Sequence, residues 1–251
     1  MAEVDDRGGT RLVELREEPP LLLRRTRSYD GSAVVHLVGG AAGPLGGDDL
    51  ELEIEVRPQA ALCLRTVAAS VALPARSRRP SRFAVSATVG AGGILHWLPE
   101  QTVAAAGCRH TTSATVAVAA GGSVLWRDEL VCGRHAERPG DASVHTSVDY
   151  AGTPLLRQRI DVGPGADGWD GPAVLGGAPA TGSLLGVRPG SRPVAPVVLG
   201  PTAVRVPLAG PGWLVTATAA DAHTLRTQLT EPAVPDAEHR PDGRRTGRGR
   251  G

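Results

Sequence analysis

A weak internal repeat of about thirty residues is the feature that most constrains the fold of this chain. Four segments read as strand, tight turn, strand, and they begin at Val56, Val89, Val118 and Asp149, which places their starts 33, 29 and 31 positions apart. Stacked repeats of this length bury a continuous core between neighbouring copies. We therefore expect an all-β fold with one or two short helices, built of stacked strand-turn-strand units and either β-helix-like or sandwich-like.

When the second and third units are aligned on their turns, the match between them continues beyond the turns. Trp97 in one unit matches Trp126 in the next, and Glu100 matches Glu129. Stacking of the units would bring each pair together. Aromatic residues make up only 3% of the chain, so the core must consist of Val, Leu and Ala, with the two tryptophans as its large side chains.

The rest of the chain divides by composition. Residues 1–20 are expected to be a flexible lead, 21–230 a β domain, and 231–251 a disordered tail rich in Arg and Gly. Within the domain, residues 163–193 contain nine glycines and five prolines, which predicts a connector without a long regular element. Further strands are predicted at 21–23, 34–38, 50–56, 204–208 and 213–218. A short helix is predicted over 221–229, with Asp221 as its N-cap.

Charge and composition exclude several functions. The chain has no lysine, so it has no phosphate-loop lysine and no lysine for a Schiff base. Its 27 basic and 26 acidic residues give a net charge of +1, which argues against a nucleic-acid partner. We find neither a secretory signal nor a membrane-spanning segment and expect a cytoplasmic protein. Three cysteines form no disulfide framework.

Two groups of residues could bind metal. Cys108 and His110, together with Cys132 and His135, offer four soft or borderline ligands. The second group consists of carboxylates, which hold a divalent ion more weakly than thiolates do and would let it pass on; its members are Asp48, Asp49, Glu100, Asp128 and Glu129. Each of these residues also has a plain structural interpretation, as a buried cysteine or a solvated acid.

Four segments stand out by their order and spacing along the chain. They are the glycine-rich segment with Gly46, Gly47 and Asp48, the segment 65–70 with Thr66, the segment 94–102 with Trp97, Leu98, Pro99 and Glu100, and the segment 126–134 with Asp128, Gly133 and Arg134. In this order they resemble motifs of the UreD (UreH) family of urease accessory proteins. The segment from Gly212 to Val215, followed by the predicted helix, also fits. The resemblance covers roughly residues 20–230.

The resemblance implies a function that composition does not reveal. Members of this family are not enzymes; they bind urease apoprotein and the accessory proteins UreF and UreG and help deliver nickel to urease. It implies a largely β fold, no tightly bound cofactor, transient contact with Ni²⁺, and no nucleic-acid or membrane partner. GTP hydrolysis would belong to UreG.

On this basis we hypothesise that Glu100, Asp128 and Glu129 line or flank a route for the ion. The motif residues Gly46, Gly47, Pro99 and Gly133 are more simply explained as shaping turns. Two alternatives remain open from the sequence: a β-rich binding module unrelated to urease, and a metalloenzyme that uses the Cys/His group.

Overall fold

The computed structural model describes residues 1–28, 30–76, 79–190 and 194–231. These residues form eighteen strands and a single helix, which confirms the predicted all-β class. The strands are β1 (Ala2–Val4), β2 (Thr10–Leu12), β3 (Leu21–Thr26), β4 (Ala33–Gly39), β5 (Asp49–Val56), β6 (Ala61–Thr66), β7 (Ser70–Ala72), β8 (Ser81–Val89), β9 (Ile94–Leu98), β10 (Thr102–Ala104), β11 (Arg109–Val118), β12 (Ser123–Val131), β13 (Asp141–Tyr150), β14 (Thr153–Val162), β15 (Ala180–Val187), β16 (Val197–Gly200), β17 (Ala203–Pro207) and β18 (Gly212–Ala219), and the helix is α1 (Ala222–Thr230).

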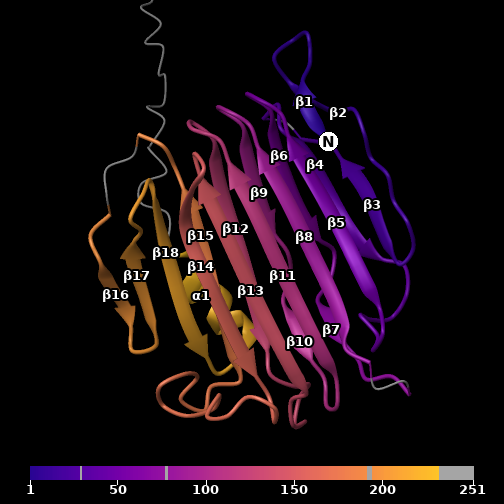
Figure 1. Cartoon of the computed structure of the whole chain (residues 1–251), viewed down its shortest axis with the longest axis vertical. Coiled ribbons are helices and arrows are strands. Elements are labelled where there is room, and N and C mark those ends of the chain that lie inside the picture. Colours follow the sequence, from indigo (N-terminus) through magenta and orange to yellow (C-terminus); the bar gives the residue numbers. More distant parts are fainter. Residues whose placement is uncertain (29, 77–78, 191–193, 232–251) are drawn as a thin grey trace, which may run out of the picture.

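Two sheets face each other and form a stacked, solenoid-like body (Figure 1). Sheet A has the order β14-β13-β11-β8-β5-β1-β2, and sheet B the order β16-β17-β18-β15-β12-β9-β6-β4-β3. In the middle of the body, successive repeats add parallel strands to both sheets: β5, β8, β11 and β13 in sheet A, and β6, β9 and β12 in sheet B. The predicted stacking of strand-turn-strand units is therefore confirmed.

Four-residue turns carry the chain from sheet A to sheet B in the first three units. In each turn the fourth residue donates its N–H to the carbonyl of the first: Ala60 to Arg57, Gly93 to Gly90 and Gly122 to Ala119. The third residue of each has a positive φ, as a type II turn requires: 64° at Gln59, 67° at Gly92 and 84° at Gly121. The repeat detected in the sequence is thus a repeat of this turn.

The fourth unit differs from this pattern. Strands β13 and β14 pair with each other in antiparallel fashion and both stay in sheet A. The two residues between them, Ala151 and Gly152, have φ values of 51° and 77°, which suits a tight two-residue hairpin. The prediction that this segment continues the stack is correct for its first strand only.

The core between the sheets consists of small aliphatic side chains around two tryptophans, as predicted. Trp97 and Trp126 are aligned in neighbouring strands and stack with their ring centroids 5.3 Å apart. Both are buried, Trp126 to 1% exposure. Offset stacking of this kind adds roughly 1 kcal/mol to the burial of the rings.

Two predicted irregular segments are more ordered than expected. The lead, residues 1–20, contributes β1 and β2, and Ala2 is completely buried in the main core. The Gly/Pro-rich connector contains the eight-residue strand β15. Its glycines serve close packing, because a Cβ at Gly186 would lie 2.3 Å from the ring of Trp213 and one at Gly182 would lie 2.6 Å from the Asp128 carbonyl oxygen. The predicted disordered tail lies outside the described residues, apart from Glu231.

Helix α1 packs on the outer face of sheet B, mainly against β15 and β18. Asp221 caps it by accepting hydrogen bonds from the backbone N–H and the hydroxyl of Thr224, as predicted. Leu225 and Leu229 are fully buried against the sheet. No helix in the described ranges is long and apolar enough to cross a membrane.

Candidate functional site: two internal cavities that meet at Asp128

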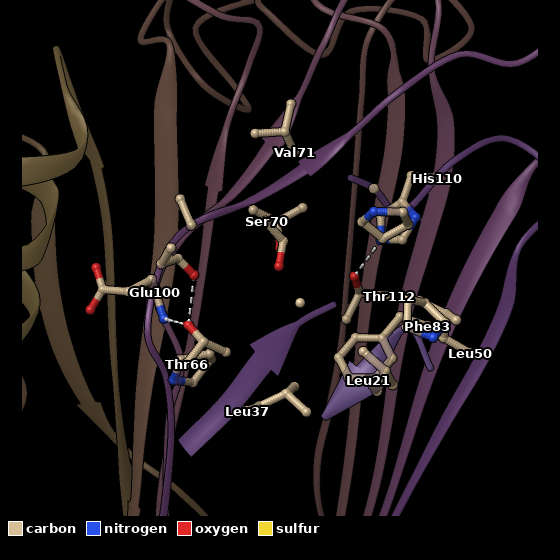
Figure 2. Close-up of a pocket in the computed structure, with 18 of the residues that line it drawn as sticks. Leu21, Leu37, Leu50, Thr66, Ser70, Val71, Phe83, Glu100, His110 and Thr112 are labelled. Atoms are coloured by element: carbon tan, nitrogen blue, oxygen red, sulfur yellow. Dashed lines mark hydrogen bonds between the residues drawn. The ribbon is translucent and has the colours of Figure 1, made fainter. Parts of the chain in front are cut away.

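A cavity of about 520 Å³ lies between the sheets, at the end of the body opposite the four-residue turns. Apolar side chains from both sheets face it, among them Leu21, Leu37, Leu50 and Phe83 (Figure 2). Backbone segments 41–44 and 67–71 also line it. The cavity therefore has an apolar wall with a small number of polar groups, which is the usual character of a binding or transport pocket.

The family motifs converge on this cavity. Each of the four segments contributes to its wall, through Asp48, Thr66, Trp97, Pro99, Glu100, Asp128 and Arg134. The stacking explains why, because segments about thirty residues apart occupy equivalent places in neighbouring coils. The remaining motif residues have other roles. Leu98 packs under α1, a Cβ at Gly46 or Gly133 would meet backbone atoms, and Gly47 has a positive φ of 101°.

Glu100 and Glu129 lie close together, as the register predicted, and both contact one arginine. Arg226 of α1 donates to the two carboxylate oxygens of Glu129, with Nε distances of 2.7 and 2.9 Å, and to those of Glu100, at 3.0 and 3.1 Å. The Glu100 carboxylate points away from the cavity (Figure 2). These carboxylates are occupied by the guanidinium and anchor the helix.

Asp128 is the one member of the predicted trio whose carboxylate faces the interior. Trp126 donates its Nε1–H to the carboxylate, 3.1 Å from Oδ2, and the Thr146 hydroxyl donates at 2.7 Å. Burial raises the pKa of Asp128 to about 6, although these two donors act in the opposite direction. The carboxyl is thus held in place inside the body by two hydrogen-bond donors.

A second cavity, of about 490 Å³, shares part of its wall with the first. Asp128, Glu129 and Val144 line both. The wall of the second cavity is rich in hydroxyl groups, contributed by Thr146, Thr181, Ser183, Thr202, Thr216 and Thr218. It also contains Gln158, whose Oε1 is buried without a hydrogen-bond donor in the described part of the chain. Asp128 therefore stands at the junction of an apolar chamber and a hydroxyl-lined one.

The Cys/His group does not form a metal site. Cys108 and Cys132 belong to an apolar cluster, where burial raises the pKa of each thiol to about 11, and His135 is exposed on the surface. Over the described residues, no three His, Cys, Asp or Glu side chains are placed to hold an ion together. The metalloenzyme alternative is therefore wrong, because these cysteines are core residues kept as neutral thiols.

Three residues of this region were not predicted from the sequence in their actual roles. His110 lines the first cavity, with its ring nitrogens 2.9 Å from Ser81 Oγ and 3.0 Å from Thr112 Oγ1, and burial lowers its pKa to about 4. Strand alternation could have placed His110 inside, since Ala114 and Val116 share its face. No local pattern pointed to Arg226 or to Thr146.

The fold and the site define a class of protein: a two-sheet β-solenoid in which four separated motif segments line one cavity between the sheets. A family model for the UreD urease accessory protein matches residues 2–234. The chain is 48% identical over 236 residues to urease accessory protein UreD 3 of Streptomyces griseus, covering 92% of each chain. It is 44% identical to urease accessory protein UreD of Streptomyces avermitilis, again over 92% of each, and 44% identical to that of a Parafrankia species, over 90% of this chain and 84% of the relative.

The chain belongs to the UreD family of urease accessory proteins. It is an accessory protein of urease and not an enzyme itself, which confirms the expectation drawn from the motifs. The alternative of a β-rich module unrelated to urease is set aside by these similarities.

Proposed function

We propose that this chain is a scaffold of the urease maturation complex that helps deliver Ni²⁺ to urease apoprotein, together with UreF and UreG. The family and the names of its relatives support a role in urease maturation. The absence of lysine supports the assignment of GTP hydrolysis to a partner, because a phosphate loop needs that residue. On this proposal the chain works in the cytoplasm, with nickel as its cargo and no tightly bound cofactor.

The convergence of the family motifs on one cavity is the observation that carries this proposal. The ion would pass through the first cavity, contact Asp128, and continue into the hydroxyl-lined second cavity. One carboxylate with hydroxyl oxygens around it binds a divalent ion weakly and exchanges it quickly, whereas a site with thiolates would retain it. Asp128 is therefore suited to contact the ion briefly and release it.

We propose that one carboxylate, and not all three, contacts the ion. Glu100 and Glu129 both contact Arg226, so a guanidinium already fills the space that an ion would need between them. We assign these two residues to holding α1 on sheet B, and the contact with the ion to Asp128 alone.

Replacement of Asp128 by Asn tests this route, because Asn keeps the size of the side chain but loses the charge. In urease activation reconstituted with UreF, UreG and urease apoprotein, Asp128→Asn should lower the nickel bound per urease by about tenfold, the scale on which groups that tune a metal site act. Glu100→Gln is the matched control, since its carboxylate faces outward, and it should leave nickel content near that of the wild type. An equal effect of the two substitutions would refute a special role for Asp128.

A further inference from the structure

The outer face of sheet B carries a groove of about 450 Å³ beside α1 that the proposed nickel route does not use. Three arginines line it, Arg65 from β6, Arg127 from β12 and Arg226 from α1, together with His36 from β4. The one carboxylate in its wall is that of Glu100. The groove therefore has an excess of positive charge.

The carboxylates near the groove are already engaged. Glu100 and Glu129 receive the hydrogen bonds of Arg226, and the nearest approach of Glu129 to Arg127 is 3.7 Å from Nε. Through the described part of the chain, no carboxylate lies within ion-pair distance of Arg65, which is exposed. Of the three arginines, Arg65 thus has no carboxylate within ion-pair distance among the described residues, and the contact of Arg127 Nε with Glu129 is too long for a hydrogen bond.

Arg127 is the stronger indication that something binds here. Its side chain is only 8% exposed, and its Nη2 donates to the carbonyl oxygens of Leu98 and Pro99. Its Nε is buried and has no hydrogen-bond acceptor in the described residues. Leaving such a donor unsatisfied carries the desolvation penalty of the buried group.

Repulsion among the arginines adds to this cost. Burial lowers the pKa of Arg127, and the charges of Arg226 and Arg65 lower it further, against the opposite effect of Glu129 and Glu100. An anionic group in the groove would reduce the repulsion and could accept from Arg127 Nε and from the Arg65 guanidinium. A carboxylate suits this arrangement because its two oxygens can accept from two planar guanidinium groups.

We propose that this groove binds an acidic segment of a protein partner, through a carboxylate held between Arg65 and Arg127. The segment is favoured over a free anion because apolar surface adjoins the charges: Val67, at the groove wall, is 58% exposed, and Leu98 is half-buried beside it. A peptide that presents an acidic side chain next to an aliphatic one would cover both. This inference does not depend on the nickel route.

Fluorescence anisotropy of the full chain tests this inference with a labelled peptide, Gly-Glu-Leu-Glu-Gly, and its counterpart with Gln in place of Glu. The acidic peptide should bind, the Gln peptide should bind at least about tenfold more weakly, and Arg65→Ala should weaken the acidic peptide to a similar degree, as expected for a lost charge-assisted hydrogen bond. Arg127→Lys, which keeps the charge but loses the planar donor, should also weaken it.

Arg109→Ala is the matched control, because Arg109 is an exposed strand arginine of sheet A. It should bind the acidic peptide as the wild type does. Equal binding of the two peptides, or full binding by Arg65→Ala, would overturn the proposal. Displacement of the peptide by inorganic phosphate at the same concentration as by the peptide itself would also overturn it, since the groove would then be a site for small anions.

Discussion

At the scale of single residues, two titratable groups inside the body respond to pH in opposite directions. The pKa of Asp128 is raised to about 6 by burial, from 3.8, so between these values the folded protein holds a proton that the unfolded chain has lost. Stability from this group is fully present below pH 3.8 and is lost as pH rises through 6. The pKa of His110 is lowered to about 4 from 6.5, so stability falls as pH drops through that window.

We expect Asp128→Asn to reveal the contribution of His110. In the wild type the two effects oppose each other between pH 4 and 6, whereas in the variant only the loss of stability on acidification remains. The difference in free energy of unfolding between wild type and variant should shift in favour of the variant by up to about 3 kcal/mol from pH 4 to pH 8. Urea denaturation across this range measures it.

Asp167→Asn provides the control for that measurement, because Asp167 is exposed in the connector. The free energy of unfolding of this variant should follow that of the wild type at every pH. Parallel curves for Asp128→Asn and the wild type would contradict the prediction, because they would mean that folding does not raise the pKa of Asp128.

At the scale of elements, the attachment of α1 depends on one ion-pair cluster and two leucines. The Glu129 side chain is 1% exposed, whereas those of Arg226 and Glu100 are 26% and 37% exposed. Removal of one partner from a buried pair is costly because the other charge stays buried. The cost should therefore depend on which partner is lost.

We predict that Arg226→Gln destabilises the protein by about 2 to 4 kcal/mol, because Glu129 would lose all its hydrogen bonds from Arg226 and keep only the longer contact with Arg127, at 3.7 Å. Glu100→Gln should cost less than about 1 kcal/mol, since Glu100 is partly exposed and Arg226 keeps Glu129. Urea denaturation measures both, and hydrogen exchange of residues 222–230 should rise in the first variant. In the double variant Arg226→Gln with Glu129→Gln, most of the lost stability should return. Independent, additive effects would contradict the coupling.

Some of these elements can be predicted from local patterns in the sequence, and others cannot. The turn repeat, the stacked tryptophans and the capped helix follow from local patterns, namely glycine pairs, register and an N-cap residue. The hairpin at Ala151 and Gly152 could have been distinguished, since two residues separate its strands where four separate the others. Strand β15 could not, because Gly182 and Gly186 are required by distant partners that the local sequence does not identify.

At the scale of the whole molecule, the stacking of the repeats brings four motifs that are separated in the sequence together on the wall of the first cavity. The sequence predicted that Glu100 and Glu129 would be neighbours, and it identified Asp128 as a candidate. Strand alternation from Trp126, which the sequence placed in the core, puts Asp128 on the interior face and Glu129 on the opposite one. The sequence could not predict that α1 covers that opposite face and that Arg226 contacts Glu129 there. The wall that the two cavities share is likewise a property of the assembled body.

Val144 offers a test of that continuity which leaves Asp128 intact. It lies on β13 and lines both cavities at their junction. Val144→Phe should narrow the junction, at a cost in stability of roughly 1 to 3 kcal/mol for the added volume. If ions pass from one cavity to the other, nickel content of urease in the reconstituted activation should fall severalfold, while binding of the chain to its partners stays normal.

Ser147→Phe is the control, because Ser147 lies on the same strand and faces outward. Normal nickel content with Val144→Phe would mean that the ion does not cross the junction, and an effect of Asp128→Asn would then have to arise from the fold.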